Sequence, residues 1–271
     1  MAATTRHDAG ELVGVMPLAG SANRISPLPL SKELFPIGFH PAGPDGEPRA
    51  KPVCLYLLEQ MRRGGVRRAF LVLRPGKWDI PAYLQDGALV GIDLAYLVMP
   101  YGYGVPYTVD RASAHLQGAR VAFGYPDIII EQDDVIATIN TVQAESGADV
   151  VLAAFPMADP DNWGMIDFDE HLQVRHLAEK PGRTHMTHTW GAAVWAPSFT
   201  RFMHEQLAQM RPDVVQRTAD GTAQEIQIAD IMRAAIDQGL SIRAHLFPHG
   251  TLRDIGRPST LVQAVRDYAG G

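Results

Sequence analysis

Short apolar runs alternate with segments of helical spacing along most of the chain. The apolar runs that predict strands lie at 12–18, 68–73, 94–98, 120–123 and 150–155. Apolar residues at helical spacing predict helices over 53–63, 107–116 and 131–145. A regular alternation of strands and helices is typical of a mostly parallel sheet that carries helices on both of its faces.

The pattern changes after Pro160. Two short apolar runs flank Asp169-Glu170 and predict a β-hairpin over 163–177. Beyond it the pattern predicts strands at 189–195 and 242–247, and helices over 199–210, 226–238 and 258–268. The Pro/Gly-rich stretch 41–52 predicts a loop and not a domain linker, because the strand-helix pattern resumes on both sides. We therefore expect one α/β domain over 1–271, with a Rossmann-like, mostly parallel mixed sheet and a small hairpin and helical portion, divided into halves at 11–160 and 161–271.

Composition narrows the class of protein. Hydrophobic residues make up 46% of 271 residues, enough for a large buried core, and the net charge of −6 is unlike that of a nucleic-acid binder. The single cysteine, Cys54, lies in an apolar run, which excludes a disulfide framework and fits a reducing compartment. Residues 1–10 have no apolar stretch, and no run approaches the ~18 apolar residues of a membrane span. We expect a cytoplasmic protein that binds neither membranes nor nucleic acid.

The loop after the first predicted strand is the first place to search for a ligand site, because ligands of open α/β sheets bind beyond the carboxyl ends of strands. Small residues follow Leu18, and the cations Arg24 and Lys32 follow them. Small residues let backbone N–H groups approach a polyphosphate, and the two cations suit its charge. The loop matches neither the P-loop pattern nor G-x-G-x-x-G. On the pattern alone, an ordinary surface loop with two solvated cations is an equally good interpretation.

The same segment resembles the opening signature of the nucleotidyltransferases typified by glucose-1-phosphate thymidylyltransferase, L-A-G-G-x-G-x-R-L-x-P followed by S-K-x-L-x-P-I. The matching residues are Leu18, Ala19, Gly20, Arg24, Pro27, Ser31, Lys32, Leu34, Pro36 and Ile37. The resemblance implies that Arg24 and Lys32 contact a triphosphate and help catalyse its reaction. It also implies nucleotide-binding roles for Leu18, Ala19, Gly20 and Ser21, although Ser21-Ala22-Asn23 stands where the family has glycines.

The resemblance continues through a segment that binds the nucleobase in this family. Residues 98–107 are similar to V-Q-P-x-x-x-G-L-A-Q, and Gly104 keeps the glycine that packs against the base. Met99 stands where the family has a glutamine that reads thymine or uracil. Methionine has no hydrogen-bond donor and only a weak acceptor, so the choice of base stays open.

Two aspartates are the candidate metal ligands. Asp127 follows a predicted strand, where a carboxylate is well placed to hold a hard cation against phosphates. The family has G-D at this position with the aspartate on Mg²⁺; here Tyr125-Pro126 separates Gly124 from Asp127. A turn or helix-capping carboxylate is the alternative. Residues 252–257 resemble W-L-D-T-G-T, which implies that Asp254 is the second Mg²⁺ ligand.

The second half of the chain resembles the family's acceptor-binding motifs. Residues 163–166 are similar to Y-G-V-V/I, in which the glycine, here Gly164, contacts the sugar. Residues 178–181 resemble E-E-K-P, which implies that Glu179 binds sugar hydroxyls and Lys180 the sugar phosphate. In isolation these are two solvated charges. Trp190-Gly191 replaces a small T-G pair, so we expect an acceptor pocket with an aromatic wall.

The resemblance implies a Mg²⁺-dependent enzyme that transfers a nucleoside monophosphate from a nucleoside triphosphate to a sugar-1-phosphate and releases pyrophosphate. The half at 11–160 then binds the nucleotide, and the half at 161–271 binds the acceptor. The acceptor could also be a cyclitol phosphate, a phosphonate or a choline-like phosphate. The family's habit suggests a homo-oligomer. The alternative is a catalytically degenerate member that binds sugar nucleotides and regulates a partner.

Overall fold

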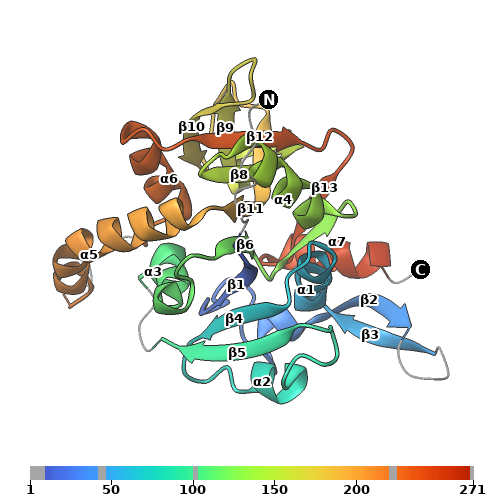
Figure 1. The fold of residues 1–271 in the computed structure, drawn as a ribbon. Coiled ribbons are helices and arrows are strands. Elements are labelled where there is room, and N and C mark those ends of the chain that lie inside the picture. The colour runs from blue at the N-terminus through green and yellow to red at the C-terminus, as the bar shows by residue number, and fades with distance from the viewer. Residues whose placement is uncertain (1–9, 42–46, 100–102, 220–224, 269–271) are drawn as a thin grey trace, which may run out of the picture.

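A nine-stranded mixed sheet forms the centre of the computed structural model, which describes residues 10–41, 47–99, 103–219 and 225–268 (Figure 1). Its strands are β1 (Leu12–Leu18), β4 (Arg68–Leu73), β5 (Asp93–Val98), β6 (Arg120–Gly124), β8 (Val150–Pro156), β9 (Gly164–Phe168), β10 (Val174–Glu179), β11 (His188–Trp195) and β12 (Ile242–Leu246). The strand order is β10-β9-β11-β6-β1-β4-β5, and β8 and β12 extend from β11 as a branch. The sheet therefore contains strands from both predicted halves of the chain.

Most strands of this sheet run in one direction. β1 pairs in parallel with β4 and β6, β4 with β5, and β8 with β12. β11 is antiparallel to β6, β8 and β9, and β10 is antiparallel to β9. Only β10 and β11 therefore oppose the others, which confirms the predicted mostly parallel mixed sheet.

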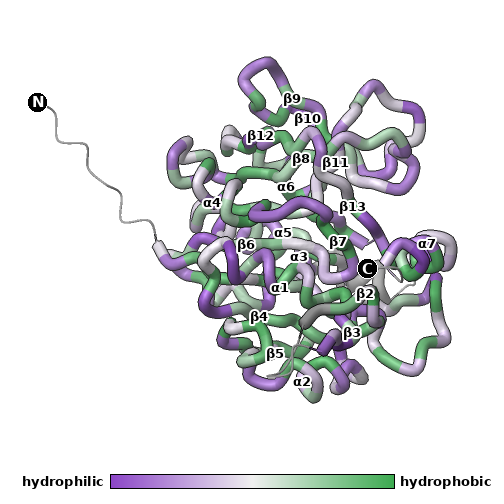
Figure 2. Tube along the Cα trace, turned by 90° about the vertical axis from the view of Figure 1, so that its right-hand side faces the viewer, coloured by the Kyte–Doolittle hydropathy of each residue, from purple (hydrophilic) through white to green (hydrophobic). Residues whose placement is uncertain are grey.

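Helices cover both faces of the sheet, as predicted. One face carries α1 (Val53–Arg63), α2 (Asp79–Leu84) and α4 (Val135–Ser146); the other carries α3 (Val105–Asp110), α5 (Pro197–Ala219) and α6 (Ile228–Asp237). The alternation of β1 explains this arrangement, because Val13 and Val15 enter one apolar cluster while Met16 and Leu18 enter the other. Figure 2 shows the hydrophobic residues concentrated in the interior strands, with hydrophilic residues in the turn between β9 and β10.

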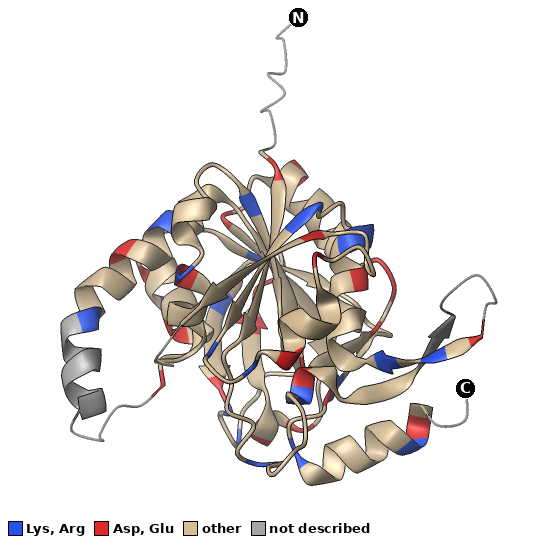
Figure 3. Cartoon of the chain, turned by 90° about the horizontal axis from the view of Figure 1, so that it is seen from below, with Lys and Arg blue, Asp and Glu red and all other residues tan. Residues whose placement is uncertain are grey.

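Two short antiparallel ladders lie outside the main sheet. β2 (Pro36–Pro41) pairs with β3 (Pro48–Pro52), so the prediction of a loop over 41–52 is wrong over the second strand. Prolines stand at the ends of both strands, where the missing N–H groups do not interrupt the ladder. This hairpin and α7 (Pro258–Tyr268) extend on the same side of the molecule (Figure 3), and α7 contacts β2.

The second ladder joins β7 (Ile128–Glu131) to β13 (Thr251–Asp254). Neither strand was predicted, and the helix predicted over 131–145 begins only at Val135 in the structure, as α4. The predicted helix over 107–116 is also interrupted, since α3 ends at Asp110 and a 3-10 turn follows at Ser113–His115. Further 3-10 turns form at Lys32–Leu34 and Pro160–Asn162. In the described ranges, none of the helices combines the length and the hydrophobicity that crossing a bilayer requires.

Candidate active site

A cavity of about 460 Å³ opens beside the carboxyl ends of β1 and β6. Six predicted charged residues from separate parts of the chain line it: Arg24, Lys32, Asp127, Glu179, Lys180 and Asp254. The other predicted site residues in its lining are Ala19, Gly20, Ser21, Gly104, Gly164 and Trp190. The volume falls in the range of small-ligand sites.

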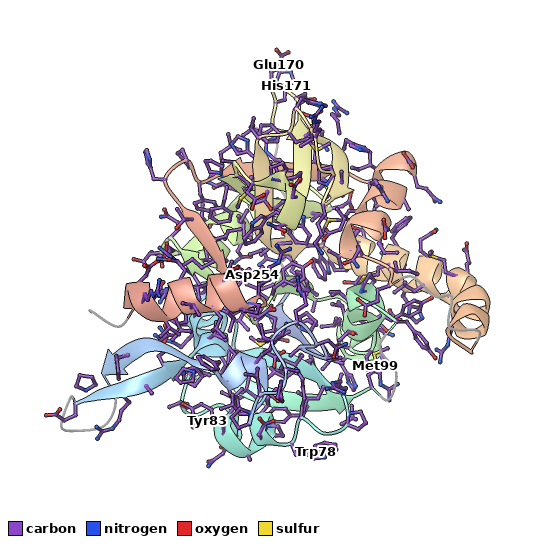
Figure 4. The ribbon with its side chains drawn as sticks, turned by 180° about the vertical axis from the view of Figure 1, so that it is seen from behind. Trp78, Tyr83, Met99, Glu170, His171 and Asp254 are labelled. Carbon is purple, nitrogen blue, oxygen red and sulfur yellow. The ribbon has the colours of Figure 1, made fainter. Side chains whose placement is uncertain are left out.

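Three predicted site residues do not line this cavity. Leu18 is buried in the core on one side of β1, and Met99 is buried in the opposite apolar cluster. Gly191 packs against the Leu252 side chain, which an added Cβ would approach to 2.9 Å. Figure 4 places Met99 near the edge of the molecule and Asp254 near its middle. Met99, predicted to bind the nucleotide because it stands where the family has its base-reading glutamine, therefore does not line this cavity. Part of that predicted segment, 100–102, lies outside the described residues.

The loop that follows β1 keeps its tight turn although it has few glycines. Ala22 adopts the left-handed conformation, with φ of 56°, and its carbonyl accepts hydrogen bonds from the backbone N–H groups of Ile25 and Ser26 at 3.1 Å. An alanine in this conformation costs ~1–2 kcal/mol. The hydrogen bonds around it hold the turn, so the cavity wall from Gly20 to Arg24 forms without the family's glycine pair.

Lys32 lies on the cavity wall in contact with Asp127, with 2.5 Å between Nζ and Oδ2. Asp79 fixes the preceding residue by accepting hydrogen bonds from the Ser31 N–H and hydroxyl at 2.6 and 2.7 Å. Burial opposes the charge on Lys32, but the carboxylate of Asp127 outweighs burial and raises the pKa of the lysine. Burial likewise opposes the charge on Asp127, and Lys32 reverses this effect and lowers its pKa. Both groups are therefore charged at neutral pH.

Asp254 reaches the same place through the β7–β13 ladder. It pairs with Ile128 in that ladder, and the N–H of Ile255 donates to the carbonyl of Asp127 at 3.1 Å. Burial and the neighbouring charge of Asp127 raise the pKa of Asp254. The backbone N–H of Gly256 donates to Oδ1 of Asp254 at 2.7 Å and holds the carboxylate in place.

These two carboxylates suit a divalent cation of the Mg²⁺ type. Mg²⁺ is commonly held by one or two carboxylates together with substrate phosphates and water. Burial is the main cause of the raised pKa of Asp254, and repulsion from the charge of Asp127 is the second. A cation beside Asp127 and Asp254 would relieve that repulsion, so the residues present fit the metal that the sequence resemblance implied.

A buried ion pair supports the cavity wall behind Lys32. The Lys77 ammonium lies 2.7 Å from both carboxylate oxygens of Glu33, and the two side chains are 6% and 2% exposed. Burial raises the pKa of Glu33 and lowers that of Lys77, since it disfavours both charges. The pair fixes the residue that follows Lys32 in the chain, and Glu33 also lines the cavity.

Replacing Lys77 with methionine should destabilise the fold strongly. The substitution leaves the Glu33 carboxylate buried without a partner, a change that typically costs ~3–5 kcal/mol. We expect urea unfolding to show this loss for Lys77→Met. The double variant Glu33→Gln/Lys77→Met should recover most of the loss because it removes both charges. Equal stability of Lys77→Met and the wild type would contradict the role assigned to the pair.

The opposite end of the cavity holds the predicted acceptor residues. A Cβ added to Gly164 would lie 2.9 Å from Glu179 Oε2 and 3.5 Å from Trp190 Nε1, so this glycine leaves room for two polar groups. The Lys180 ammonium lies 3.3 Å from Glu179 Oε1. Lys180 has a left-handed backbone with φ of 47°, and its N–H donates to the Trp163 carbonyl. Strain of this kind in a ligand cavity is typical of a functional position.

Gly104 lines the cavity. Its backbone conformation and its contact with Ile226 require a glycine here, whether or not a nucleobase packs against it. Its φ and ψ of 106° and 170° are almost restricted to glycine, and an added Cβ would lie 2.2 Å from the Ile226 carbonyl oxygen. A parallel bridge joins the two residues, which brings the segment before α6 to the cavity.

Gly104→Ala should therefore lose more stability than Gly118→Ala. Both positions have positive φ, but an added Cβ at Gly118 meets nothing within 4 Å. The collision with Ile226 should add ~1–3 kcal/mol to the conformational strain that the two variants share. Chemical denaturation of both variants measures the difference, and equal losses would show that the contact with Ile226 is unimportant.

Several cavity residues were not among the predicted site residues. The structure adds Glu33, Thr108, Tyr125, Asn162, Trp163, Glu225 and Gln227 to the lining. Tyr125 has no counterpart in the family's G-D pattern, but its place directly after β6 is a signal for the cavity. Glu33 adjoins Lys32, but its burial depends on Lys77, which is distant in the sequence.

The cavity lies at the carboxyl ends of strands in a Rossmann-like sheet and contains both cations and carboxylates. This arrangement is typical of α/β proteins that bind phosphate groups. The chain belongs to the nucleotidyl transferase family, whose family model matches residues 18–270. This result confirms the family predicted from the sequence and, with it, the nucleotidyltransferase class of enzyme.

Two curated relatives resemble most of the chain. The low-salt glycan biosynthesis nucleotidyltransferase Agl11 of Haloferax volcanii is 22% identical over 256 residues, which cover 93% of this chain and 64% of the relative. A glucose-1-phosphate thymidylyltransferase of Xanthomonas campestris is 25% identical over 247 residues, 88% of this chain and 72% of the relative. The chain thus spans about two thirds of the length of these relatives.

A solved structure of UDP-glucose pyrophosphorylase complexed with UDP-glucose is similar in fold. The TM-score is 0.76 at 18% sequence identity, and the match covers 96% of this chain and 99% of the other. At this identity the comparison supports the fold, and it confirms the Rossmann-like architecture.

Proposed function

We propose that the protein transfers a nucleoside monophosphate from a nucleoside triphosphate to a sugar-1-phosphate or a similar phosphorylated small molecule and releases pyrophosphate. The observation that carries the proposal is the convergence of three cations on one cavity with the two candidate metal ligands, Asp127 and Asp254. The cations are Arg24, Lys32 and Lys180. The family match and the relatives named for nucleotidyl transfer support it.

In this reaction a phosphate oxygen of the acceptor attacks the α-phosphorus of the triphosphate. The bond between the α-phosphorus and the bridging oxygen to the β-phosphate breaks, and pyrophosphate leaves with the electron pair. A phosphate monoester is largely ionised at neutral pH, with a second pKa of about 6, so no general base is needed. Catalysis then rests on placement and on stabilisation of negative charge.

The residues of the cavity divide between the two substrates. Arg24 and Lys32, near the loop after β1, bind the triphosphate and stabilise the leaving pyrophosphate. Lys180 holds the acceptor's phosphate, while Glu179 accepts hydrogen bonds from its hydroxyls. When Mg²⁺ is bound at Asp127 and Asp254, it supplies further positive charge to the phosphates. A cyclitol phosphate as acceptor, homo-oligomeric assembly and a cytoplasmic location stay predictions.

A pyrophosphate-release assay tests this function. The wild-type protein is supplied with Mg²⁺, each of the four nucleoside triphosphates and a panel of acceptors that includes hexose 1-phosphates, cyclitol phosphates and choline phosphate. We expect pyrophosphate only when metal, triphosphate and acceptor are all present. Tight nucleotide binding without turnover on the whole panel would overturn the proposal and favour the degenerate, regulatory alternative.

A further inference from the structure

Two aromatic side chains at the acceptor end of the cavity each carry one polar group, a hydroxyl on Tyr125 and an indole N–H on Trp190. Both residues line the cavity. Across the described ranges, neither group makes a hydrogen bond, and no side-chain nitrogen or oxygen is both buried and unpaired. Both groups must therefore be accessible from the cavity, although Trp190 as a whole is only 5% exposed.

The two rings pack against each other and against Phe123. The Tyr125 and Trp190 ring centroids are 5.7 Å apart, and both rings contact Phe123, at 5.2 and 6.2 Å. Phe123 is fully buried in β6, so both rings pack against a rigid part of the core. Aromatic pairs at such separations are mutually stabilising. The ring positions therefore exist before any ligand binds.

The Glu179 carboxylate supplies a hydrogen-bond acceptor beside these two donors. Glu179 Oε2 and Trp190 Nε1 lie 2.9 and 3.5 Å from the position that a Cβ on Gly164 would occupy. Tyr125 presents a phenol to the same cavity, and an ordinary phenol with a pKa of about 10 keeps its proton at neutral pH. The phenol is therefore protonated at neutral pH and available as a donor.

We propose that the Tyr125 hydroxyl and the Trp190 indole N–H donate hydrogen bonds to oxygen atoms of the acceptor, opposite the Glu179 carboxylate, and that Tyr125 determines acceptor specificity. This inference rests on the proposed function. Buried polar sites discriminate strongly, because a ligand that lacks the matching group leaves the site's donors unpaired. The arrangement selects acceptors with both hydrogen-bond donors and acceptors near their phosphate. It disfavours a quaternary ammonium compound, which has neither.

The test compares Tyr125→Phe and Trp190→Phe with the wild type in steady-state assays, using the triphosphate and acceptor that the wild type turns over. Tyr125→Phe keeps the ring and its contact with Phe123. We expect each variant to lower kcat/KM for the acceptor by about 10-fold, the effect of one lost hydrogen bond to a neutral group. The KM for the triphosphate should change less than twofold, since the triphosphate binds at the other end of the cavity.

Two matched variants, Tyr83→Phe and Trp78→Phe, control for the loss of a hydroxyl or an indole elsewhere. Both residues are exposed and lie at the edge of the molecule, away from Asp254 (Figure 4). Their kinetics should equal those of the wild type. If Tyr125→Phe keeps the wild-type kcat/KM for the acceptor, or loses affinity for triphosphate instead, the specificity role is wrong.

The acceptor panel separates this inference from the function on which it rests. Turnover of a hydroxylated acceptor but not of choline phosphate by the wild type is the expected result. Efficient use of choline phosphate would overturn the inference and leave the transferase function intact. A wild-type protein that releases no pyrophosphate with any acceptor overturns the function and the inference together.

Discussion

Asp254→Asn is expected to lower turnover by ~10²–10³-fold while leaving the protein folded. The variant removes one of two carboxylates that fit Mg²⁺, and a lost electrostatic contribution in an active site has an effect of this size. The concentration of Mg²⁺ needed for half-maximal rate should rise in parallel. Pyrophosphate release across a Mg²⁺ titration measures both quantities. An unchanged Mg²⁺ dependence would remove Asp254 from the metal site.

The stability of the same variant provides an independent check. The pKa of Asp254 is raised in the folded protein by burial and by Asp127, so the ionised carboxylate disfavours folding at neutral pH. Asp254→Asn should therefore be at least as stable as the wild type at pH 7. Any gain should vanish as the pH falls below the ordinary aspartate range, where the carboxyl is protonated in both the folded and the unfolded state. Thermal unfolding at several pH values tests this sign.

Lys32→Met should have the largest effect on catalysis, a loss of ~10³-fold or more in kcat. The substitution removes a cation proposed to stabilise the leaving pyrophosphate. A cation that stabilises the transition state of phosphoryl transfer typically raises kcat by ~10³–10⁵-fold. It also leaves Asp127 without its 2.5 Å partner and beside Asp254. Single-turnover measurement at saturating triphosphate separates a lost chemical step from lost binding.

Lys51→Met is the matched control for this variant. Lys51 pairs with Glu59 at 2.6 Å and lies over the Tyr56 ring, in a second cavity behind the β7–β13 ladder. Its replacement removes the same charge without touching the active-site cavity, so kcat should stay within about twofold of the wild type. Equal losses for the two lysine variants would indicate a general effect of charge and contradict the specific role of Lys32.

The sequence predicted the elements whose pattern is local. Buried strands such as β1 and β4 read as continuous apolar runs because both faces of the sheet are covered. α1 ends at Arg63 before Gly64-Gly65, as its spacing and the following glycines indicated. The β9–β10 hairpin was also evident from the short apolar runs around Asp169-Glu170.

The elements that were missed depend on partners distant in the sequence. β7 and β13 are short, and each is a strand only because the other pairs with it. The β2–β3 hairpin was hidden by prolines, which are acceptable there because the two strands pair only with each other in the described part of the chain. Neither feature has a periodicity that a single segment could reveal.

The same distinction applies to the candidate site. The charged residues were found by their resemblance to family motifs, and the structure places all six of them on one cavity. Met99 shows the limit of that approach, since alignment with a base-reading glutamine did not reveal that its side chain turns into the core. The Glu33–Lys77 pair and the open hydroxyl of Tyr125 exist only through tertiary contacts.

A crystal structure of the wild-type protein with Mg²⁺ and a non-hydrolysable nucleoside triphosphate analogue tests the central claim most directly. We expect a triphosphate between Arg24 and Lys32, with the metal bound by Asp127 and Asp254 and the α-phosphorus open toward Lys180. A triphosphate bound elsewhere, or a metal that contacts neither aspartate, would contradict it.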